Sequence, residues 1–210
     1  MKIVAISDTH GMHRSVSIPD GDVFIHTGDL TSMGTGAEVV AFNEWLGSLP
    51  HKHKIIIAGN HDWCFQGDSD WCRDQLTNAI YLEDEATTID GVKFYGSPWQ
   101  PEFCNWAFNL PRGAALKEKW DLIPPDTDVL LTHSPAFEVL DCVDYEGSVG
   151  CEELAIAIKR VKPSYHIFGH IHEDYGTRVV GPTTHVNAST CNGRYKPVNK
   201  PMVIEVSHVS

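Results

Sequence analysis

The sequence predicts an α/β fold in which two packed sheets are flanked by helices. Short apolar runs of strand length alternate with segments that have helical spacing, and the second half of the chain adds further strands joined by turns. Continuous apolar runs are typical of strands buried on both faces, and alternating strands and helices indicate a layered α/β domain. Because no repeat or long linker interrupts the pattern, we expect one domain over residues 1–210.

Each expected element follows from a local pattern. Buried strands are predicted for five β-branched, apolar runs, at residues 2–6, 22–26, 54–58, 128–131 and 165–168. Helices are predicted where apolar residues recur at helical spacing, at 37–49, 113–120 and 150–161. Residues 86–89 and 92–95 flank Asp90-Gly91, which is a strong hairpin signal. Further strands are predicted at 178–180, 184–187 and 202–206, so the second half is richer in antiparallel sheet.

Composition argues against several classes of function. The formal charge is −12, and such a surface does not favour long nucleic acid, which is held mainly by Lys and Arg. Neither a signal peptide nor an apolar run long enough for a membrane span is present, so we expect a cytoplasmic protein without membrane association. The six cysteines include no CxxC pair and are expected to be reduced and mostly buried.

Side chains that can bind metals follow all five predicted buried strands. In chain order they are Asp8 with His10, Asp29, Asn60, His133, and His170 with His172. Ligands of α/β sheets bind at the carboxyl ends of the strands. We expect the pairs 8/10 and 170/172 to be extended, which would point both side chains of a pair the same way. Imidazole and carboxylate groups suit Zn, Mn or Fe, and the set is large enough for two metals that share a carboxylate.

In this order, the motifs resemble the signature of the calcineurin-like metallophosphoesterase superfamily. They read Asp8-x-His10, Gly28-Asp29, Gly59-Asn60-His61-Asp62, His133 and Gly169-His170-x-His172. Further stretches, at 26–29, 42–47, 57–61, 108–113 and 187–191, are similar to metallophosphoesterase-domain phosphodiesterases of animal brain and their bacterial relatives. Some animal members carry glycine at the position of His170, so its presence here implies a complete second metal site.

The resemblance implies a four-layer α/β/β/α sandwich that binds two divalent metal ions. It implies that the first ion is held by Asp8, His10, Asp29 and His172, and the second by Asp29, Asn60, His133 and His170, with Asp29 bridging the two. Mn²⁺ is the expected metal. Fe, Zn, Ni and Mg are alternatives, because ligand type does not decide among them.

The implied reaction is hydrolysis of a phosphate ester by a hydroxide that bridges the two metals. His61 would stabilise the transition state or protonate the leaving oxygen, a role typically worth about 10²–10⁴-fold. The expected substrates are small phosphodiesters such as nucleotides or cyclic nucleotides. The alternatives are a phosphomonoesterase or protein phosphatase, a nuclease, and a metal-binding scaffold with little activity. The complete ligand set argues against a scaffold, and the motifs around Asp29 and Asn60 differ from those of serine/threonine phosphatases.

Several roles stay open at this level, as does the oligomeric state. Asp62 either supports Asn60 and His61 or caps a helix, since Asp is favoured at caps. Arg112 either binds a second phosphate or is a surface residue. The aromatic segment 97–112, with Trp99, Phe103 and Trp106, either lines the substrate site or packs as a loop. Thr9, Thr31 and Ser134 either contact substrate or complete turns. No ligand role is expected for His13, His26, His51, His53, His166, His185 and His208, and His26 is predicted to be buried and hydrogen-bonded.

Overall fold

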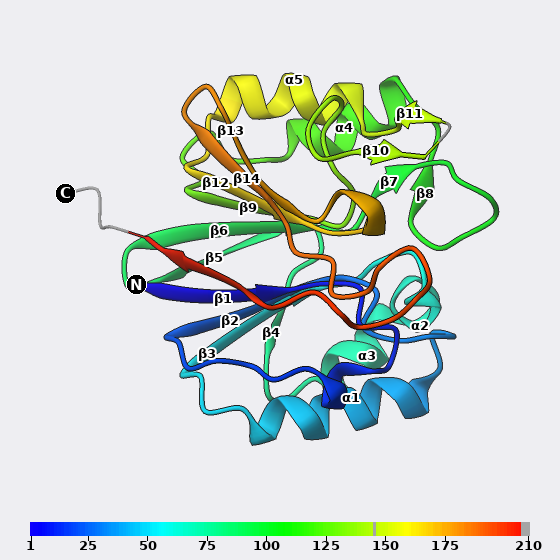
Figure 1. The fold of residues 1–210 in the computed structure, drawn as a ribbon, viewed down its shortest axis with the longest axis vertical. Coiled ribbons are helices and arrows are strands. Elements are labelled where there is room, and N and C mark those ends of the chain that lie inside the picture. Colours follow the sequence, from blue (N-terminus) through cyan, green and yellow to red (C-terminus); the bar gives the residue numbers. More distant parts are fainter. Residues whose placement is uncertain (145, 207–210) are drawn as a thin grey trace.

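In a computed structural model that describes residues 1–144 and 146–206, two mixed sheets pack face to face between two layers of helices (Figure 1). This arrangement confirms the predicted four-layer sandwich. The expectation for His208 lies outside the described residues. Among the described residues, no helix combines the length and apolar character that a membrane crossing requires.

The first sheet has the strand order β15-β1-β2-β3-β4. Strands β1 (Lys2–Ile6), β2 (Val23–Thr27), β3 (His53–Ile57) and β4 (Ile80–Tyr81) are parallel, and β15 (Met202–Glu205) runs antiparallel to β1. The outer face is covered by α1 (Gly36–Ser48), α2 (Trp63–Gly67) and α3 (Ser69–Gln75). Helix α1 begins at a capping box, because Thr35 and Glu38 satisfy each other's backbone N–H groups.

The second sheet has the order β13-β14-β12-β9-β6-β5. Its parallel centre consists of β6 (Val92–Ser97), β9 (Val129–Thr132), β12 (Tyr165–Phe168) and β14 (Thr183–Asn187). The antiparallel edges are β5 (Glu85–Ile89) and β13 (Gly176–Val180). In the predicted β5–β6 hairpin, Asp90 and Gly91 both have positive φ, at 47° and 83°, as a type I′ turn requires. The outer face is covered by α4 (Ala114–Asp121) and α5 (Glu152–Val161).

Short elements complete the fold. They are the strand pairs β7 (Gln100–Pro101) with β8 (Asn109–Leu110) and β10 (Cys142–Val143) with β11 (Gly147–Ser148), and the 3₁₀ turns η1 (His13–Ser15) and η2 (His172–Asp174).

All six cysteines are free thiols. Three are buried, but Cys104 and Cys142 are exposed, so the thiols are less buried than expected.

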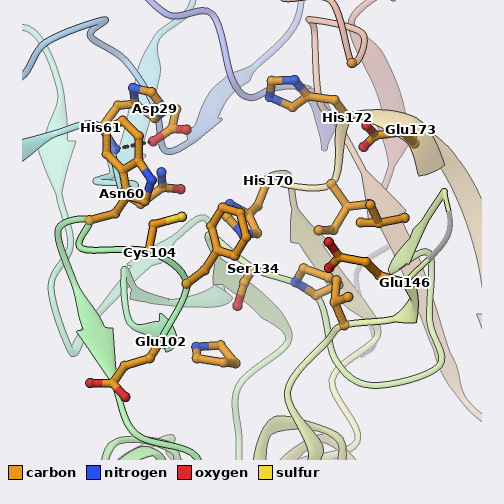
Figure 2. Close-up of a pocket in the computed structure, with 18 of the residues that line it drawn as sticks. Asp29, Asn60, His61, Glu102, Cys104, Ser134, Glu146, His170, His172 and Glu173 are labelled. Carbon is orange, nitrogen blue, oxygen red and sulfur yellow. Dashed lines mark hydrogen bonds between the residues drawn. The ribbon is translucent and has the colours of Figure 1, made fainter.

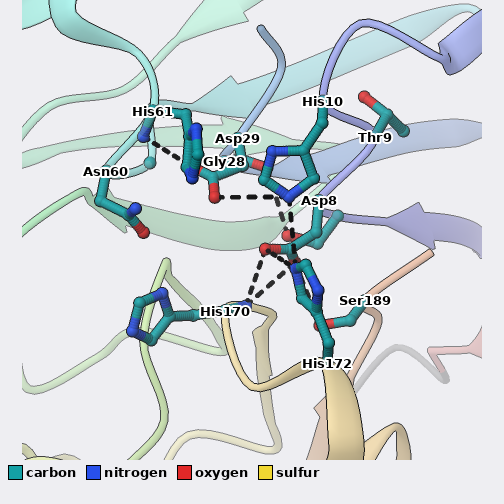
Figure 3. Close-up of polar contacts among 12 residues, drawn as sticks. Asp8, Thr9, His10, Gly28, Asp29, Asn60, His61, His170, His172 and Ser189 are labelled. Carbon is teal, nitrogen blue, oxygen red and sulfur yellow. Dashed lines mark hydrogen bonds and ion pairs between the residues drawn. The ribbon is translucent and has the colours of Figure 1, made fainter. Parts of the chain in front are cut away.

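The central core lies between the two sheets and fixes how their strand ends meet. Ile25 and Ile57 of the first sheet and Phe94 and Val129 of the second are fully buried in it. Since β1, β2, β3, β9 and β12 are parallel within their sheets, their carboxyl ends bring the following polar residues to one end of the sandwich (Figure 3).

Candidate metal centre

The predicted ligands converge where the carboxyl ends of the two sheets meet. Three groups of side chains each offer ligand atoms within 4.8 Å of one another. The groups are Asp8, His10 and His172; His10, Asp29 and His61; and Asp8, Asp29 and His133. Figure 3 shows Asp8, His10 and His172 gathered together, with Asn60 and His170 on the opposite side of Asp29.

Left-handed backbone, rather than extended chain, directs these side chains. Asp8, His10, Asp29 and His170 have φ values of 53°, 44°, 55° and 68°. Our expectation that the pairs 8/10 and 170/172 are extended was therefore wrong, and His172 instead begins the turn η2. Such residues cost about 1–3 kcal/mol each and collect at functional sites, where the surrounding fold holds them.

Two glycines permit the close approach of the ligand loops. A Cβ on Gly59 would lie 2.4 Å from the backbone nitrogen and from Oδ1 of Asp29. A Cβ on Gly169 would lie 2.0 Å from Oδ2 of Asp8. Any larger residue would displace a predicted ligand, since real Cβ contacts this short do not occur.

His133 presents a lone pair to two other acceptor atoms. Its Nδ1 donates a hydrogen bond to the carbonyl of Thr27 at 2.9 Å, so Nε2 of the neutral ring is unprotonated. That Nε2 lies 2.8 Å from Oδ1 of Asn60 and 3.5 Å from Oδ1 of Asp29. One imidazole nitrogen and two oxygens that face one another in this way have the arrangement of a metal ligand set.

His172 is oriented in the same way on the other side. Its Nδ1 donates to the carbonyl of Asn192 at 3.2 Å, which directs Nε2 toward the centre. This Nε2 lies 3.2 Å from Nε2 of His10 and 3.3 Å from Oδ1 of Asp8. In turn, Nε2 of His10 lies 3.7 Å from Oδ2 of Asp29. The residues present therefore fit two cations with Asp29 between them.

The electrostatics of the site also favour cations. Burial and the neighbouring Asp8 carboxylate raise the pKa of Asp29 well above its ordinary value. Two buried carboxylates at one site can both stay ionised at neutral pH only if positive charge lies beside them. Burial lowers the pKa of His10 and of His170 to about 3, which keeps both rings in the neutral form that binds metals.

His170 has a different relation to the site from the other ligands. Its backbone N–H donates to Oδ1 and Oδ2 of Asp8, at 3.1 and 2.9 Å. Its ring lies against His133 with 5.0 Å between centroids, and it belongs to none of the three compact groups. The ring is therefore near the Asn60–His133 side but is not drawn into a close ligand pair there.

His61 lies over the centre, where a substrate would approach. Its backbone N–H donates to Oδ1 of Asp29 at 2.8 Å, and its Nδ1 donates to the carbonyl of Ser32 at 3.0 Å. The ring stacks on Trp106 with 4.2 Å between centroids and lies 4.6 Å from the ring of His10. These contacts fix the ring and leave Nε2 as the nitrogen that can exchange a proton with a ligand.

Asp62 supports the ligand loops and caps no helix. Although it precedes α2, its side chain makes no capping bond. It is fully buried and accepts from the backbone N–H of Gly59 at 2.8 Å, of Thr31 at 2.9 Å and of Leu30 at 3.2 Å. The Thr31 hydroxyl donates to it at 2.6 Å, so Thr31 completes this support. Asp62 thus joins the loop of Asn60 and His61 to the loop of Asp29.

A cavity of about 590 Å³ opens in front of these residues (Figure 2). Its lining includes Phe103, Trp106 and Tyr195, together with the carboxylates of Glu102, Glu146 and Glu173 (Figure 2 labels the three acids). Ser134 also lines it.

Two of the residues left open by the sequence serve the fold around this cavity. Arg112 lines the cavity, but its guanidinium donates to the carbonyls of Val149 and Gly150 at 2.6 and 2.7 Å. Trp99 packs on Phe108 and donates to Asp84, away from the cavity lining. The aromatic segment is therefore divided, since only Phe103 and Trp106 of its large rings face the cavity.

Sequence reasoning missed the loop between β14 and β15. The ring of Tyr195 lies 4.8 Å from that of His10 and 5.1 Å from that of His172, and Ser189 donates to Oδ2 of Asp8 at 3.0 Å. Asn192 folds this loop by accepting from the backbone of Arg194 and Lys196. Only the family-like stretch 187–191 signalled the loop.

The prediction that His26 is buried and hydrogen-bonded is confirmed. Its side chain is fully buried, and its Nε2 lies 2.9 Å from the hydroxyl of Thr9. Thr9 is therefore bonded to His26.

Known proteins are similar to this chain in sequence or in fold. A profile of the calcineurin-like phosphoesterases matches residues 1–174. Metallophosphoesterase domain-containing protein 1 of Homo sapiens is 47% identical over 232 residues, covering 98% of this chain and 71% of that protein. A UPF0046 protein of Caenorhabditis elegans is 40% identical, covering 98% of this chain and 75% of its own.

Among solved structures, TT1561 of Thermus thermophilus is similar in fold, with a TM-score of 0.60 at 18% identity, covering 89% of this chain and 88% of that one. The family match, the extent of the sequence identity and the clustered ligand groups agree. The chain therefore belongs to the calcineurin-like phosphoesterases, a family of metal-dependent hydrolases of phosphate esters.

Proposed function

We propose that this protein hydrolyses small phosphodiesters, such as nucleotides or cyclic nucleotides, with two divalent cations, Mn²⁺ first among them. One cation would be held by Asp8, His10, Asp29 and His172, and the other by Asp29, Asn60, His133 and His170. The supporting observation is that Nε2 of His133 lies 2.8 Å from Oδ1 of Asn60, and Nε2 of His172 lies 3.3 Å from Oδ1 of Asp8. Imidazole nitrogens that face carboxylate and amide oxygens at these distances suit a divalent cation between them.

The protein's own residues would orient the substrate and supply a proton. When bound, the cations supply positive charge that polarises the phosphoryl group and lowers the pKa of a coordinated water. His61, fixed through Nδ1 by the carbonyl of Ser32, would in its protonated form donate from Nε2 to the leaving oxygen. Trp106 stacks on that ring and limits its rotation. Asp62 holds the loop that carries His61 against the loop that carries Asp29.

The cavity supports a diester over a monoester. Glu102, Glu146 and Glu173 line it, and they would repel a dianionic monoester more strongly than a monoanionic diester. Arg112 is already bound to backbone carbonyls and to Glu152. Phosphomonoester hydrolysis is the second candidate.

A single domain over residues 1–210 and a cytoplasmic location stay predictions. The single domain is supported by one hydrophobic core that joins Ile3, Phe94 and Ile204.

The test compares bis-p-nitrophenyl phosphate with p-nitrophenyl phosphate at saturating Mn²⁺. We expect a higher kcat/KM for the diester, and we expect His61→Ala to lower kcat by about 10²–10⁴-fold without loss of bound metal. His53→Gln, which alters a histidine outside the centre, is the matched control and should keep wild-type turnover. A faster monoester reaction would replace the diesterase proposal by the phosphomonoesterase. Wild-type turnover by His61→Ala would remove His61 from the chemistry.

A further inference from the structure

A second cavity, of about 410 Å³, lies at the antiparallel edge of the six-stranded sheet. It is bordered by the end of α5, the loop at 136–139 and the β13–β14 hairpin. Figure 1 shows α5 and this hairpin at the top of the molecule. It shares no lining residue with the cavity at the metal centre. Its volume falls within the range of small-molecule sites, about 300–1,000 Å³.

The charged lining of this cavity is mainly positive. Lys159, Lys162 and Arg178 line it, against the single carboxylate of Glu138. Within the part of the chain that the structure describes, none of these three cations forms an ion pair. Arg178 makes one bond, to the backbone carbonyl of Glu138 at 3.1 Å, and keeps its other donors. In a chain with a charge of −12, these side chains form a local excess of positive charge.

A buried chain of hydrogen bonds fixes the protonation of His185 in the cavity wall. The Thr132 hydroxyl donates to the carbonyl of Ser134 at 2.7 Å, so it must accept from Nε2 of His166 at 2.8 Å. Burial lowers the pKa of His166, whose neutral ring therefore has an unprotonated Nδ1. That Nδ1 accepts from Nδ1 of His185 at 3.0 Å. The neutral His185 ring must then present an unprotonated Nε2.

This nitrogen has no partner in the described structure. His185 is only 2% exposed and lines the cavity, and its Nε2 makes no hydrogen bond to any residue that the structure describes. It is also not one of the fully enclosed nitrogens without partners, so it opens to the cavity. A ligand of this cavity that carries a donor can therefore bond to His185.

We propose that this cavity binds a small organic phosphomonoester. Its anionic oxygens would contact Lys159, Lys162 and Arg178, and its second proton, with a pKa of about 6, would form the bond to His185. The monoanion brings this proton itself, and the dianion would bind with uptake of one proton from water, held by the phosphate oxygen or by Nε2 of His185. Val139, Ile158 and Val180 supply an apolar surface for the organic group. A carboxylate lacks the donor, and inorganic phosphate lacks the apolar group.

The test uses phenylphosphonate, whose C–P bond a phosphoesterase does not cleave. Histidine-labelled protein is titrated and followed by NMR, with the His185 signals assigned from His185→Gln. We expect saturable shifts of His185 and His166, and at least about tenfold weaker binding by Arg178→Gln and by Lys162→Gln, because hydrogen bonds to charged groups are worth about 1.5–3 kcal/mol. Lys117→Gln on the neighbouring helix is the control and should bind like wild type.

Three results would overturn the proposal. Shifts confined to the histidines of the metal centre would show that phenylphosphonate binds only there. Unchanged affinity in both Arg178→Gln and Lys162→Gln would remove the anion site. Equal binding of uncharged benzyl alcohol would reduce the cavity to an apolar pocket. None of these outcomes depends on phosphodiesterase turnover, so either proposal can fail without affecting the other.

Discussion

Replacing Asp62 by asparagine should destabilise the protein through two backbone groups. One carboxylate oxygen accepts from the N–H and the hydroxyl of Thr31, at 2.9 and 2.6 Å, and an amide oxygen can keep both contacts. The other oxygen accepts from the N–H groups of Gly59 and Leu30, at 2.8 and 3.2 Å. In Asp62→Asn an NH₂ group replaces this oxygen and faces those two donors, which are then buried without an acceptor.

The expected loss is large compared with total stability. A buried donor without a partner costs about 1–3 kcal/mol, so two cost about 2–6 kcal/mol, against a typical total of about 5–15 kcal/mol. Urea unfolding of the metal-free protein measures the change. Asp121→Asn, which alters a surface carboxylate, is the control and should leave the midpoint nearly unchanged. An Asp62→Asn midpoint equal to that of wild type would refute the support role of Asp62.

Two further predictions concern the loop over the centre and the paired histidines. The ring of Tyr195 lies within 5.1 Å of the rings of His10 and His172. Tyr195→Ala should therefore raise KM for a diester, whereas Tyr195→Phe should keep the wild-type KM. Equal KM values in both variants would contradict a packing role of the ring. Burial lowers the pKa of His185 to about 4, and that of His166 well below its usual value. The unfolded chain therefore takes up protons between pH 6.5 and 4 where the folded chain does not, so both groups reduce stability as pH falls through this range. His166→Gln should flatten the fall in urea midpoint over that range, and an unchanged slope would contradict the burial of a neutral pair.

The strands and the ligand identities were predictable because their signals are local. Residues 2–6 and 165–168 are mainly apolar runs, and their strands have the predicted bounds. The predicted ligands follow such runs directly, so the parallel order of the sheets was enough to bring them together. Helix α1 was equally visible from its spacing, and α2 and α3 were not, because segments of five and seven residues are too short to display a helical period.

Features that depend on tertiary contacts were not predictable. The left-handed backbone at Asp8 and His170 is held by the opposing loop, and nothing in the neighbouring residues signals it. Tyr195 reaches the centre through a loop folded by Asn192, far along the chain from the residues it contacts. The role of Arg112 is decided by carbonyls 37 and 38 residues away. Local patterns carry no information on contacts of this range.

The most direct test of the account is the number of metal ions bound. Mn²⁺ is measured by mass spectrometry after equilibrium dialysis of wild type, His133→Ala and His172→Ala, with His51→Gln as a control outside the centre. The two-cation arrangement predicts about two ions per chain in wild type and in the control, and about one in each of the other variants. One ion or none in wild type, or two ions retained by both ligand variants, would contradict it.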